Sequence, residues 1–312
     1  MRLKLKELAE RTGVSVSTVS RVLNNRGRIA PETRRRILEL ARPGNNIRLV
    51  LLVVPHEILG WYSISLLNAL KLRAAELGYA LEITAGEDLA SLPEQNFFGV
   101  ISFDYSNHLA SFWGRNYALP LVCLNDIGNP LEGICAVFSD EADGMSQALN
   151  HLVSYNHRRI GLLTCGNPET FANCRRCDVF LAAMERFGLG NHAVIRHSMH
   201  EKYEPYGVVK ELCESGVSAI INLSETNSLH ILHALHVAGV RVPQDLSFVT
   251  MELPYVSEFL DPPLTTLEQN YTALAATAFD TLERLVRGDR TSFEQTVPYL
   301  FRKRASVTLA RN

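Results

Sequence analysis

Short polar side chains and an arginine lie close together near the start of the chain, in a pattern suited to reading DNA. The segment Ser15–Leu23 has helical spacing, and Val19, Val22 and Leu23 would form its buried face. Short side chains on the opposite face would let the helix enter a major groove about 12 Å wide, where an arginine can donate two hydrogen bonds to guanine. The residues that we predict to read bases are Val16, Ser17, Ser20 and Arg21.

Basic residues around this segment predict contacts with the phosphate backbone of nucleic acid. Residues 1–48 contain twelve Lys/Arg and four Asp/Glu, a balance of +8, whereas the rest of the chain contains nineteen and twenty-nine, a balance of −10. A basic module on an acidic body indicates a polyanionic partner for the first part only. The residues that we expect to contact phosphates are Ser15, Thr18, Asn24, Arg26, Arg28, Arg34 and Arg35.

Three short helices are expected to position these side chains. Residues 5–11 have apolar residues at helical spacing, and Gly13 follows them where a tight turn needs a positive φ. Ser15 is a good N-cap for the second helix, and Pro31 is a favoured first residue for the third. Two helices joined by a glycine turn and braced by a third form a helix-turn-helix. The alternative is a three-helix protein-interaction module, but the charge, the turn spacing and the small helix face favour DNA.

The stretch from Leu5 to Asn24 strongly resembles the DNA-binding head of LacI-type bacterial repressors. Their pattern is a helix ending in Ala-x-x-x-Gly-Val-Ser, two variable residues and then Thr-Val-Ser-Arg-Val-Leu-Asn, and this sequence matches it almost throughout. The resemblance implies that Val16, Ser17 and Arg21 read bases, which agrees with the assignment above. It also implies a homodimeric repressor on double-stranded operator DNA, with half-sites about 34–36 Å apart.

The linker after the predicted head is unusually short. We place the head at residues 1–42 and the linker at residues 43–46, which lead directly into an apolar run. Relatives of this family usually have a longer segment here, including a hinge helix whose leucine wedges into the minor groove. Such wedging kinks DNA and extends the interface. A second hypothesis is therefore a hinge-deficient sensor protein with only weak or non-specific DNA binding.

From residue 47 to residue 312 the chain alternates apolar strands with amphipathic helices. We expect strands at residues 48–54, 99–102, 119–124, 160–164, 218–222 and 246–250, and helices at 64–77, 145–155, 177–187, 228–238 and 273–287. This alternation predicts an α/β body of parallel sheets with helices on both faces, and its length favours two lobes. The expected lobes are residues 47–157 with 265–290, and residues 158–264 with 291–312.

The body resembles the LacI-type regulatory domain, which is itself similar to periplasmic sugar-binding proteins. The matching segments are residues 157–163, 242–249, 262–269 and 304–306. The resemblance implies an all-α helix-turn-helix head on an α/β two-lobed periplasmic-binding-protein-like domain that binds an effector and dimerises. The effector would be a small molecule such as a sugar, bound beyond the carboxyl ends of the strands.

The resemblance extends to the effector site less completely. Arg176 matches an arginine that clamps sugar hydroxyls, although a structural salt bridge is the alternative. Glu252 takes the place of the first acid in the family's aspartate pair, and Ser224 begins the segment where relatives have Asn-Asp. An aromatic ring at the entry of the first lobe is suited to the apolar face of a sugar. The expected effector-binding residues are Trp61, Tyr62, Asp104, Arg176, Ser224 and Glu252.

Catalytic and metal-binding patterns are not evident in the sequence. We find no nucleophile elbow, phosphate-cradling loop or paired carboxylates at a fixed spacing, so an α/β enzyme that acquired a basic head is the third and weakest hypothesis. Cys174 and Cys177 form a single CxxC, and His230, His233 and His236 recur without a cysteine or carboxylate at ligand spacing. We therefore expect no metal, no cofactor and no catalysis. With neither a long apolar run nor a cleavable leader, the expected location is the cytoplasm.

Two arginine substitutions separate base reading from phosphate contact. We expect Arg21→Ala to lose discrimination between operator and unrelated DNA, because its guanidinium reads base edges. Arg35→Ala should instead weaken binding to any sequence and reduce the slope of log Kd against log salt by about one. Salt titrations of both variants on both duplexes measure these effects. Equal effects of the two substitutions would discredit the assigned reading helix.

Overall fold

The computed structural model describes residues 4–23, 29–41, 48–55, 60–91, 97–103, 119–125, 134–198, 205–224, 227–289 and 294–311. The chain divides into two compact units. The first comprises residues 1–59, 63–138 and 271–296, and the second comprises residues 60–62, 139–270 and 297–312.

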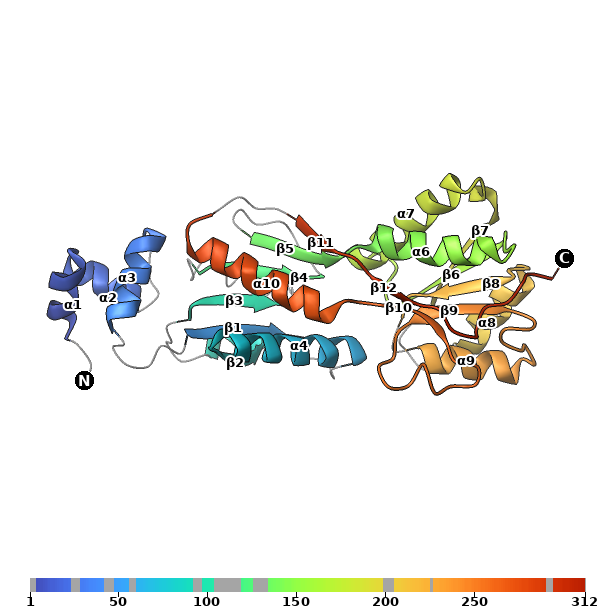
Figure 1. Cartoon of the computed structure of the whole chain (residues 1–312), viewed down its shortest axis with the longest axis horizontal. Coiled ribbons are helices and arrows are strands. Elements are labelled where there is room, and N and C mark those ends of the chain that lie inside the picture. Colours follow the sequence, from blue (N-terminus) through green and yellow to red (C-terminus); the bar gives the residue numbers. More distant parts are fainter. Residues whose placement is uncertain are drawn as a thin grey trace. The chain divides into compact units, whose positions relative to one another are not determined.

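The helix-turn-helix expected in the first residues is confirmed (Figure 1). Its elements are α1 (Leu5–Thr12), α2 (Val16–Leu23) and α3 (Pro31–Ala41). Gly13 ends α1 with a φ of 69°, and its N–H donates to the carbonyl of Ala9. The Thr18 N–H donates to Ser15 Oγ at 3.1 Å, so Ser15 caps α2. The helices meet over a small core that contains Leu8, Ala9, Val19, Val22 and Ile37.

The rest of the first unit is a parallel sheet covered by helices. Its elements are β1 (Arg48–Val54), α4 (Trp61–Leu77), β2 (Tyr79–Ala85), the 3₁₀ helix η1 (Gly86–Ser91), β3 (Gly99–Ser102), β4 (Leu121–Leu124), β5 (Ile134–Ser139), α10 (Tyr271–Val286) and β11 (Glu294–Val297). In the described residues the strand order is β11-β5-β4-β3-β1-β2, and β1 to β5 pair in parallel. Gly99 permits close packing of α10, because a Cβ there would lie 2.5 Å from Leu282 Cδ1.

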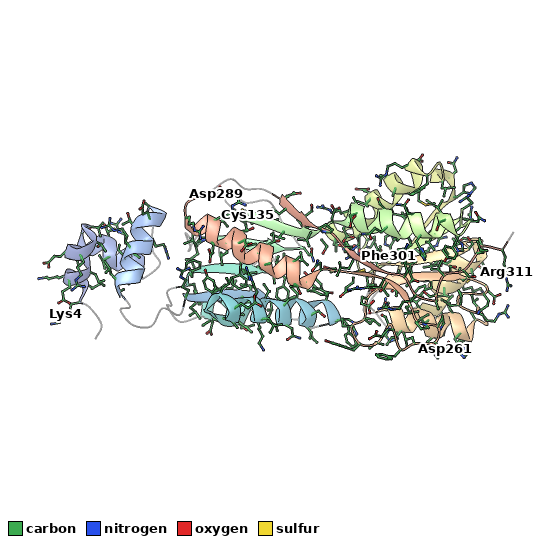
Figure 2. All side chains as sticks on the ribbon, in the orientation of Figure 1. Lys4, Cys135, Asp261, Asp289, Phe301 and Arg311 are labelled. Carbon is green, nitrogen blue, oxygen red and sulfur yellow. The ribbon has the colours of Figure 1, made fainter. Side chains whose placement is uncertain are left out.

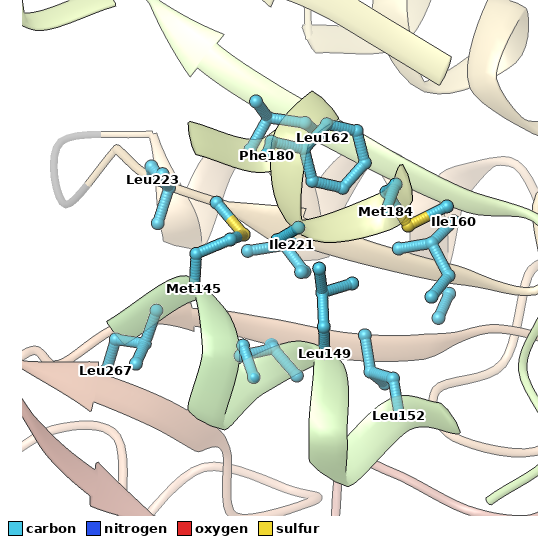
Figure 3. Packing of buried hydrophobic residues seen from close by; sticks show 14 of the residues in the cluster. Met145, Leu149, Leu152, Ile160, Leu162, Phe180, Met184, Ile221, Leu223 and Leu267 are labelled. Atoms are coloured by element: carbon cyan, nitrogen blue, oxygen red, sulfur yellow. The ribbon is translucent and has the colours of Figure 1, made fainter. Parts of the chain in front are cut away.

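The second unit repeats this plan. Its elements are α6 (Glu141–Ser154), β6 (Ile160–Cys165), α7 (Phe171–Arg186), the 3₁₀ helix η2 (Gly190–His192), β7 (Ala193–Ser198), α8 (Pro205–Glu214), β8 (Ala219–Asn222), α9 (Ser228–Val237), β9 (Ser247–Met251), β10 (Thr265–Glu268) and β12 (Leu300–Arg302). The strand order among the described residues is β12-β10-β9-β8-β6-β7. Helices α6 and α7 bury one core against the sheet (Figure 3), and α8 and α9 bury the other. The expected two-lobed α/β body is thus confirmed.

The boundaries between the lobes differ from those expected, because α6 and β10 pack in the second unit. Met145 and Leu149 of α6 join Phe180 of α7 in one buried cluster (Figure 3). Strand β10 pairs in parallel with β9 through Thr265 and Val249. The chain therefore passes between the units near residues 139, 271 and 297, rather than near 158, 265 and 291.

The last described residues form hydrogen bonds with the sheet of the second unit and with the segment before β6. The Thr265 N–H donates to Ser306 Oγ at 2.8 Å, and buried His157 lies 2.9 Å from both Ser218 Oγ and the carbonyl of Thr308. Burial lowers the pKa of His157, which keeps the ring neutral for these hydrogen bonds. Figure 2 marks Phe301 and Arg311 within this final stretch. The family-like segments around residues 157 and 306 are therefore structural.

Candidate nucleic-acid interface and effector site

The outer face of α2 carries the four side chains predicted to read bases. Val16, Ser17 and Arg21 are exposed and Ser20 is half-buried, whereas Val19 and Val22 are fully buried. Positions four apart on a helix lie one above the other, so Val16 and Ser20 are neighbours, as are Ser17 and Arg21. The structure therefore brings the predicted base-reading residues together on one exposed surface.

Hydroxyl groups at the start of α2 hold one another in place. Ser15 Oγ lies 2.8 Å from both Ser17 Oγ and Thr18 Oγ1, while it also accepts the Thr18 N–H. The first turn of a helix presents unpaired N–H groups and favours anions, so small polar residues here suit a phosphate. The expected phosphate contacts of Ser15 and Thr18 are consistent with this arrangement.

Arg34 contradicts its expected role as a phosphate contact. Its residue is only 9% exposed, because it lies one turn before fully buried Ile37 on the same face of α3. Among the described residues Nη2 has no hydrogen-bond partner, and burial lowers the pKa of Arg34 to about 10. Arg36, two residues further on, is exposed. Asn24, Arg26, Arg28 and the side chain of Arg35 lie outside the described residues.

Arg176 connects three elements at one end of the second sheet. It lies inside α7 rather than before it, with Nε 3.2 Å from Glu141 Oε1 and Nη1 3.2 Å from the carbonyl of Leu223. Glu141 begins α6, and Leu223 follows β8. The side chain of Arg176 is four-fifths buried. The salt bridge considered as the alternative for Arg176 therefore exists.

A buried polar layer surrounds Ser224 at the ends of β8 and β9. Asn222 is fully buried, and its Nδ2 donates to the carbonyl of Ser224 at 2.8 Å and to Thr250 Oγ1 at 2.9 Å. Ser228 Oγ lies 2.7 Å from Thr250 Oγ1 and donates to the carbonyl of Ser224 at 2.9 Å. These bonds fix the position of Ser224, which is itself buried.

Cys165 and Asn227 extend this polar layer, and the sequence did not single out either for the effector site. Asn227 Nδ2 lies 2.9 Å from Cys165 Sγ and 3.1 Å from Ser198 Oγ, so it joins the ends of β6 and β7. Burial raises the pKa of Cys165 more than the hydrogen bonds from Ser224 and Asn227 lower it, which favours a neutral thiol. The position of Cys165 at the carboxyl end of a parallel strand was the available signal.

Glu252 has a structural role rather than the expected effector contact. Its Oε2 lies 2.8 Å from Arg304 Nη1 and accepts a hydrogen bond from the Thr266 hydroxyl, and its Oε1 lies 3.3 Å from Arg304 Nη2. The residue is buried. Both carboxylate oxygens thus have partners inside the protein, and a buried pair of this kind is costly to break.

The remaining expected effector residues belong to the first described helix after β1 or lie outside the described residues. Trp61 and Tyr62 begin α4, where Trp61 is exposed and Tyr62 half-buried. Asp104 lies outside the described residues.

Comparison with known proteins accounts for both parts of the chain. Residues 4–45 match the profile of bacterial regulatory proteins of the lacI family, and residues 149–307, about half of the chain, match that of a periplasmic binding protein-like domain. The chain belongs to the LacI family. Its curated relatives include the HTH-type transcriptional regulator DegA of Bacillus subtilis, 26% identical over 95% of each chain. The HTH-type transcriptional regulator GalR of Lacticaseibacillus casei is 28% identical over 90% of this chain and 92% of its own length.

Solved structures share the fold of this LacI-family protein at lower identity. A lac repressor dimer bound to operator and the anti-inducer ONPF has a TM-score of 0.72 and 22% identity, covering 99% of this chain and 100% of that one. A LacI transcriptional regulator from a Rhodococcus species has a TM-score of 0.73 and 21% identity, covering 84% and 99%. The protein is accordingly a DNA-binding transcription regulator with a helix-turn-helix head and a periplasmic-binding-protein-like body.

Metal-ligand and membrane-spanning arrangements are absent from the described part of this LacI-family chain. No three or more His, Cys, Asp or Glu side chains there are placed to hold a metal ion. His230, His233 and His236 lie on an exposed face of α9, and Cys174 is exposed on α7. No described helix is both long and apolar enough to cross a bilayer.

The contrast between Arg34 and Arg36 gives a test of the interface. We expect Arg34→Met to leave the slope of log Kd against log salt unchanged, because the buried guanidinium makes no phosphate contact. Arg36→Met should reduce that slope by about one, because an exposed arginine releases counterions on binding. Fluorescence anisotropy on one operator duplex at several salt concentrations measures both slopes. If Arg34→Met reduces the slope, Arg34 does contact phosphate and its assignment as a buried structural residue is wrong.

Proposed function

We propose that this LacI-family regulator is a repressor that binds a two-half-site operator as a homodimer under the control of a small-molecule effector such as a sugar. The observation that carries the proposal is the exposed face of α2, which presents Val16, Ser17 and Arg21 without any long acidic side chain. Two such heads, about 34–36 Å apart, would read one operator.

We propose a separate function for each of three consecutive parts of the chain. Residues 1–42 form the DNA-binding head, residues 43–46 the short linker, and residues 47–312 the effector-binding and dimerising body, acting in the cytoplasm by binding rather than catalysis. The base-reading residues are Val16, Ser17, Ser20 and Arg21. The proposed phosphate contacts are Ser15, Thr18, Asn24, Arg26, Arg28 and Arg35, together with exposed Arg36.

The polar layer at the ends of β6, β8 and β9 supports the proposed effector site. Arg176 retains exposed surface beside Glu141, and charged groups of this kind hydrogen-bond hydroxyls strongly. Among the similar structures, CelR is described in complex with cellobiose and an Enterococcus faecium LacI-family regulator with bound ribose. The proposed set is Trp61, Tyr62, Asp104, Arg176 and Ser224. The effector controls DNA binding only if it binds one state of the protein better than the other.

A salt titration tests whether the head reads sequence. We expect DNA from upstream of the protein's own gene to bind at least about a thousandfold more tightly than an unrelated duplex of equal length at physiological salt. Such a preference would show that the short linker suffices. Weak and equal binding to both duplexes, collapsing as salt rises, would mean that the head supplies only charge and would overturn the proposed function.

The Arg176–Glu141 pair offers matched variants for the effector site. With ribose and cellobiose as probes, we expect one sugar at a hundred times its Kd to stabilise the protein by about 2.7 kcal/mol, seen as a rise in melting temperature. Arg176→Gln should abolish this rise because it removes the group that contacts hydroxyls. Glu141→Gln breaks the same ion pair but keeps the guanidinium, so it should retain the rise. If both variants lose the rise in melting temperature equally, Arg176 has a structural role and does not contact the sugar.

A further inference from the structure

Helix α7 carries two free cysteines three residues apart. Cys174 is exposed and Cys177 is half-buried. Residues three apart on an α-helix share one side of it, with Cα atoms about 5 Å apart, which is within the range of a disulfide. Their Cβ atoms lie about 5–6 Å apart, whereas a disulfide brings them to about 4 Å. A bond between the two sulfurs therefore requires the turn between them to tighten by about 1–2 Å.

The two thiols have different environments. Cys174 Sγ donates to the carbonyl of Pro168 at 3.4 Å, and its exposure admits a small oxidant. Cys177 packs partly on the apolar cluster between α6 and α7. Burial raises the pKa of the Cys177 thiol, and nearby Cys174 raises it further, so this thiol stays neutral. Cys174 is thus the first of the two to meet an oxidant, and Cys177 is placed one turn away to react with it.

The turn that would tighten contains Arg176. The start of α7 is fixed by Asn173, which is buried and whose Nδ2 donates to the carbonyls of Cys165 at 2.9 Å and Asn167 at 2.8 Å. Any adjustment therefore falls on residues 174–177. The guanidinium of Arg176 already connects the start of α6 with the end of β8 through bonds of 3.2 Å, and a shift of about 1–2 Å breaks contacts of that length.

We propose that Cys174 and Cys177 are a redox-modification site, at which hydrogen peroxide closes a reversible disulfide that displaces Arg176. The Cys174 thiolate attacks one peroxide oxygen, an S–O bond forms and the O–O bond breaks. The departing hydroxide takes up the proton that Cys174 had lost and leaves as water.

The second step closes the disulfide. The Cys177 sulfur attacks the Cys174 sulfur, the S–O bond breaks, and the hydroxide leaves as water with the Cys177 proton. Two thiols and one peroxide thus give one disulfide and two water molecules, and two molecules of a reducing thiol such as glutathione restore the pair. In proteins of a reducing compartment, disulfides are typically transient and redox-sensing. The disulfide stands independently of the proposed function, whereas its effect on sugar binding rests on the proposed role of Arg176.

Tryptic cleavage gives a direct test of the disulfide. Trypsin cuts after Arg175 and Arg176, so the bond would hold together two peptides that otherwise separate. After the full chain is treated with hydrogen peroxide and its remaining thiols are alkylated, we expect mass spectrometry to detect the joined peptides, and dithiothreitol to release them. Cys174→Ser and Cys177→Ser should each abolish the joined pair. Cys165 lies in the same tryptic peptide as Cys174, so Cys165→Ser is the control and should retain it.

Two results would overturn the site. One is a wild-type chain that gives no joined peptides after peroxide treatment. The other is a joined pair that survives in Cys174→Ser but is lost in Cys165→Ser, which would assign the bond to Cys165 instead.

Sugar binding tests the displacement of Arg176. With ribose and cellobiose as probes, we expect peroxide to weaken the binding of whichever sugar binds the reduced protein at least about tenfold, because hydrogen bonds from a charged group are lost. Cys177→Ser cannot close the disulfide and should keep its sugar affinity after peroxide. Cys213→Ser removes a half-buried cysteine on α8 and should respond as the wild type does. Isothermal titration calorimetry measures the affinities, and equal affinities of reduced and oxidised wild type would overturn the displacement.

The sugar-free protein gives a second measure of the same displacement. Oxidation should lower the melting temperature of the wild type, and should lower it less in Glu141→Gln, which already lacks the ion pair with Arg176. Equal changes in both proteins would overturn the displacement even if neither sugar binds. Failure of both sugars to bind the reduced protein would instead contradict the effector class of the proposed function.

Discussion

An eight-residue helix is too short to be stable alone in water, yet α2 carries the entire base-reading face of this regulator. Its stability must come from burying Val19 and Val22 against α1 and α3, in a core where the described buried apolar residues are these two with Leu8, Ala9 and Ile37. The exposed side chains of α2, which the core does not need, are therefore available to contact DNA. Arg34 lies on the face of α3 that packs on this core, so its aliphatic stem covers apolar surface and its guanidinium is buried at a cost.

In the second unit the functional edge depends on hydrogen bonds among buried polar groups. Parallel strands β6, β8 and β9 end at one edge, and the backbone and side chains there need hydrogen-bond partners. Asn222 Nδ2 lies within hydrogen-bond distance of three acceptors inside the protein, and Arg176 connects α6, α7 and the end of β8. A ligand at this edge would meet groups that are already held in position, which lowers the entropy lost on binding. The Glu252–Arg304 pair fixes the neighbouring edge and takes no part in that recognition.

The sequence was most informative where a residue's environment is set by its near neighbours. The apolar run at residues 48–54 has the same bounds as β1, Ser15 caps α2, and Pro31 is the first residue of α3. Strand β2 was missed because it is an edge strand whose residues are mostly half-exposed. The role of Glu252 depends on Arg304, 52 residues later, and the place of α6 depends on its packing against α7. Neither contact leaves a local pattern in the sequence, so the lobe boundaries and part of the effector site could not be predicted.

Charge distribution links the head to the proposed dimer. The chain beyond residue 48 has a balance of −10, so the body repels DNA and leaves binding to the basic head. The same charge opposes the approach of two bodies, although salt screens it beyond about 8 Å under physiological conditions. Close contact between two copies therefore requires an interface whose own residues do not add to this repulsion. An acidic body joined to a basic head thus confines attraction for DNA to the part of the chain that carries the base-reading residues.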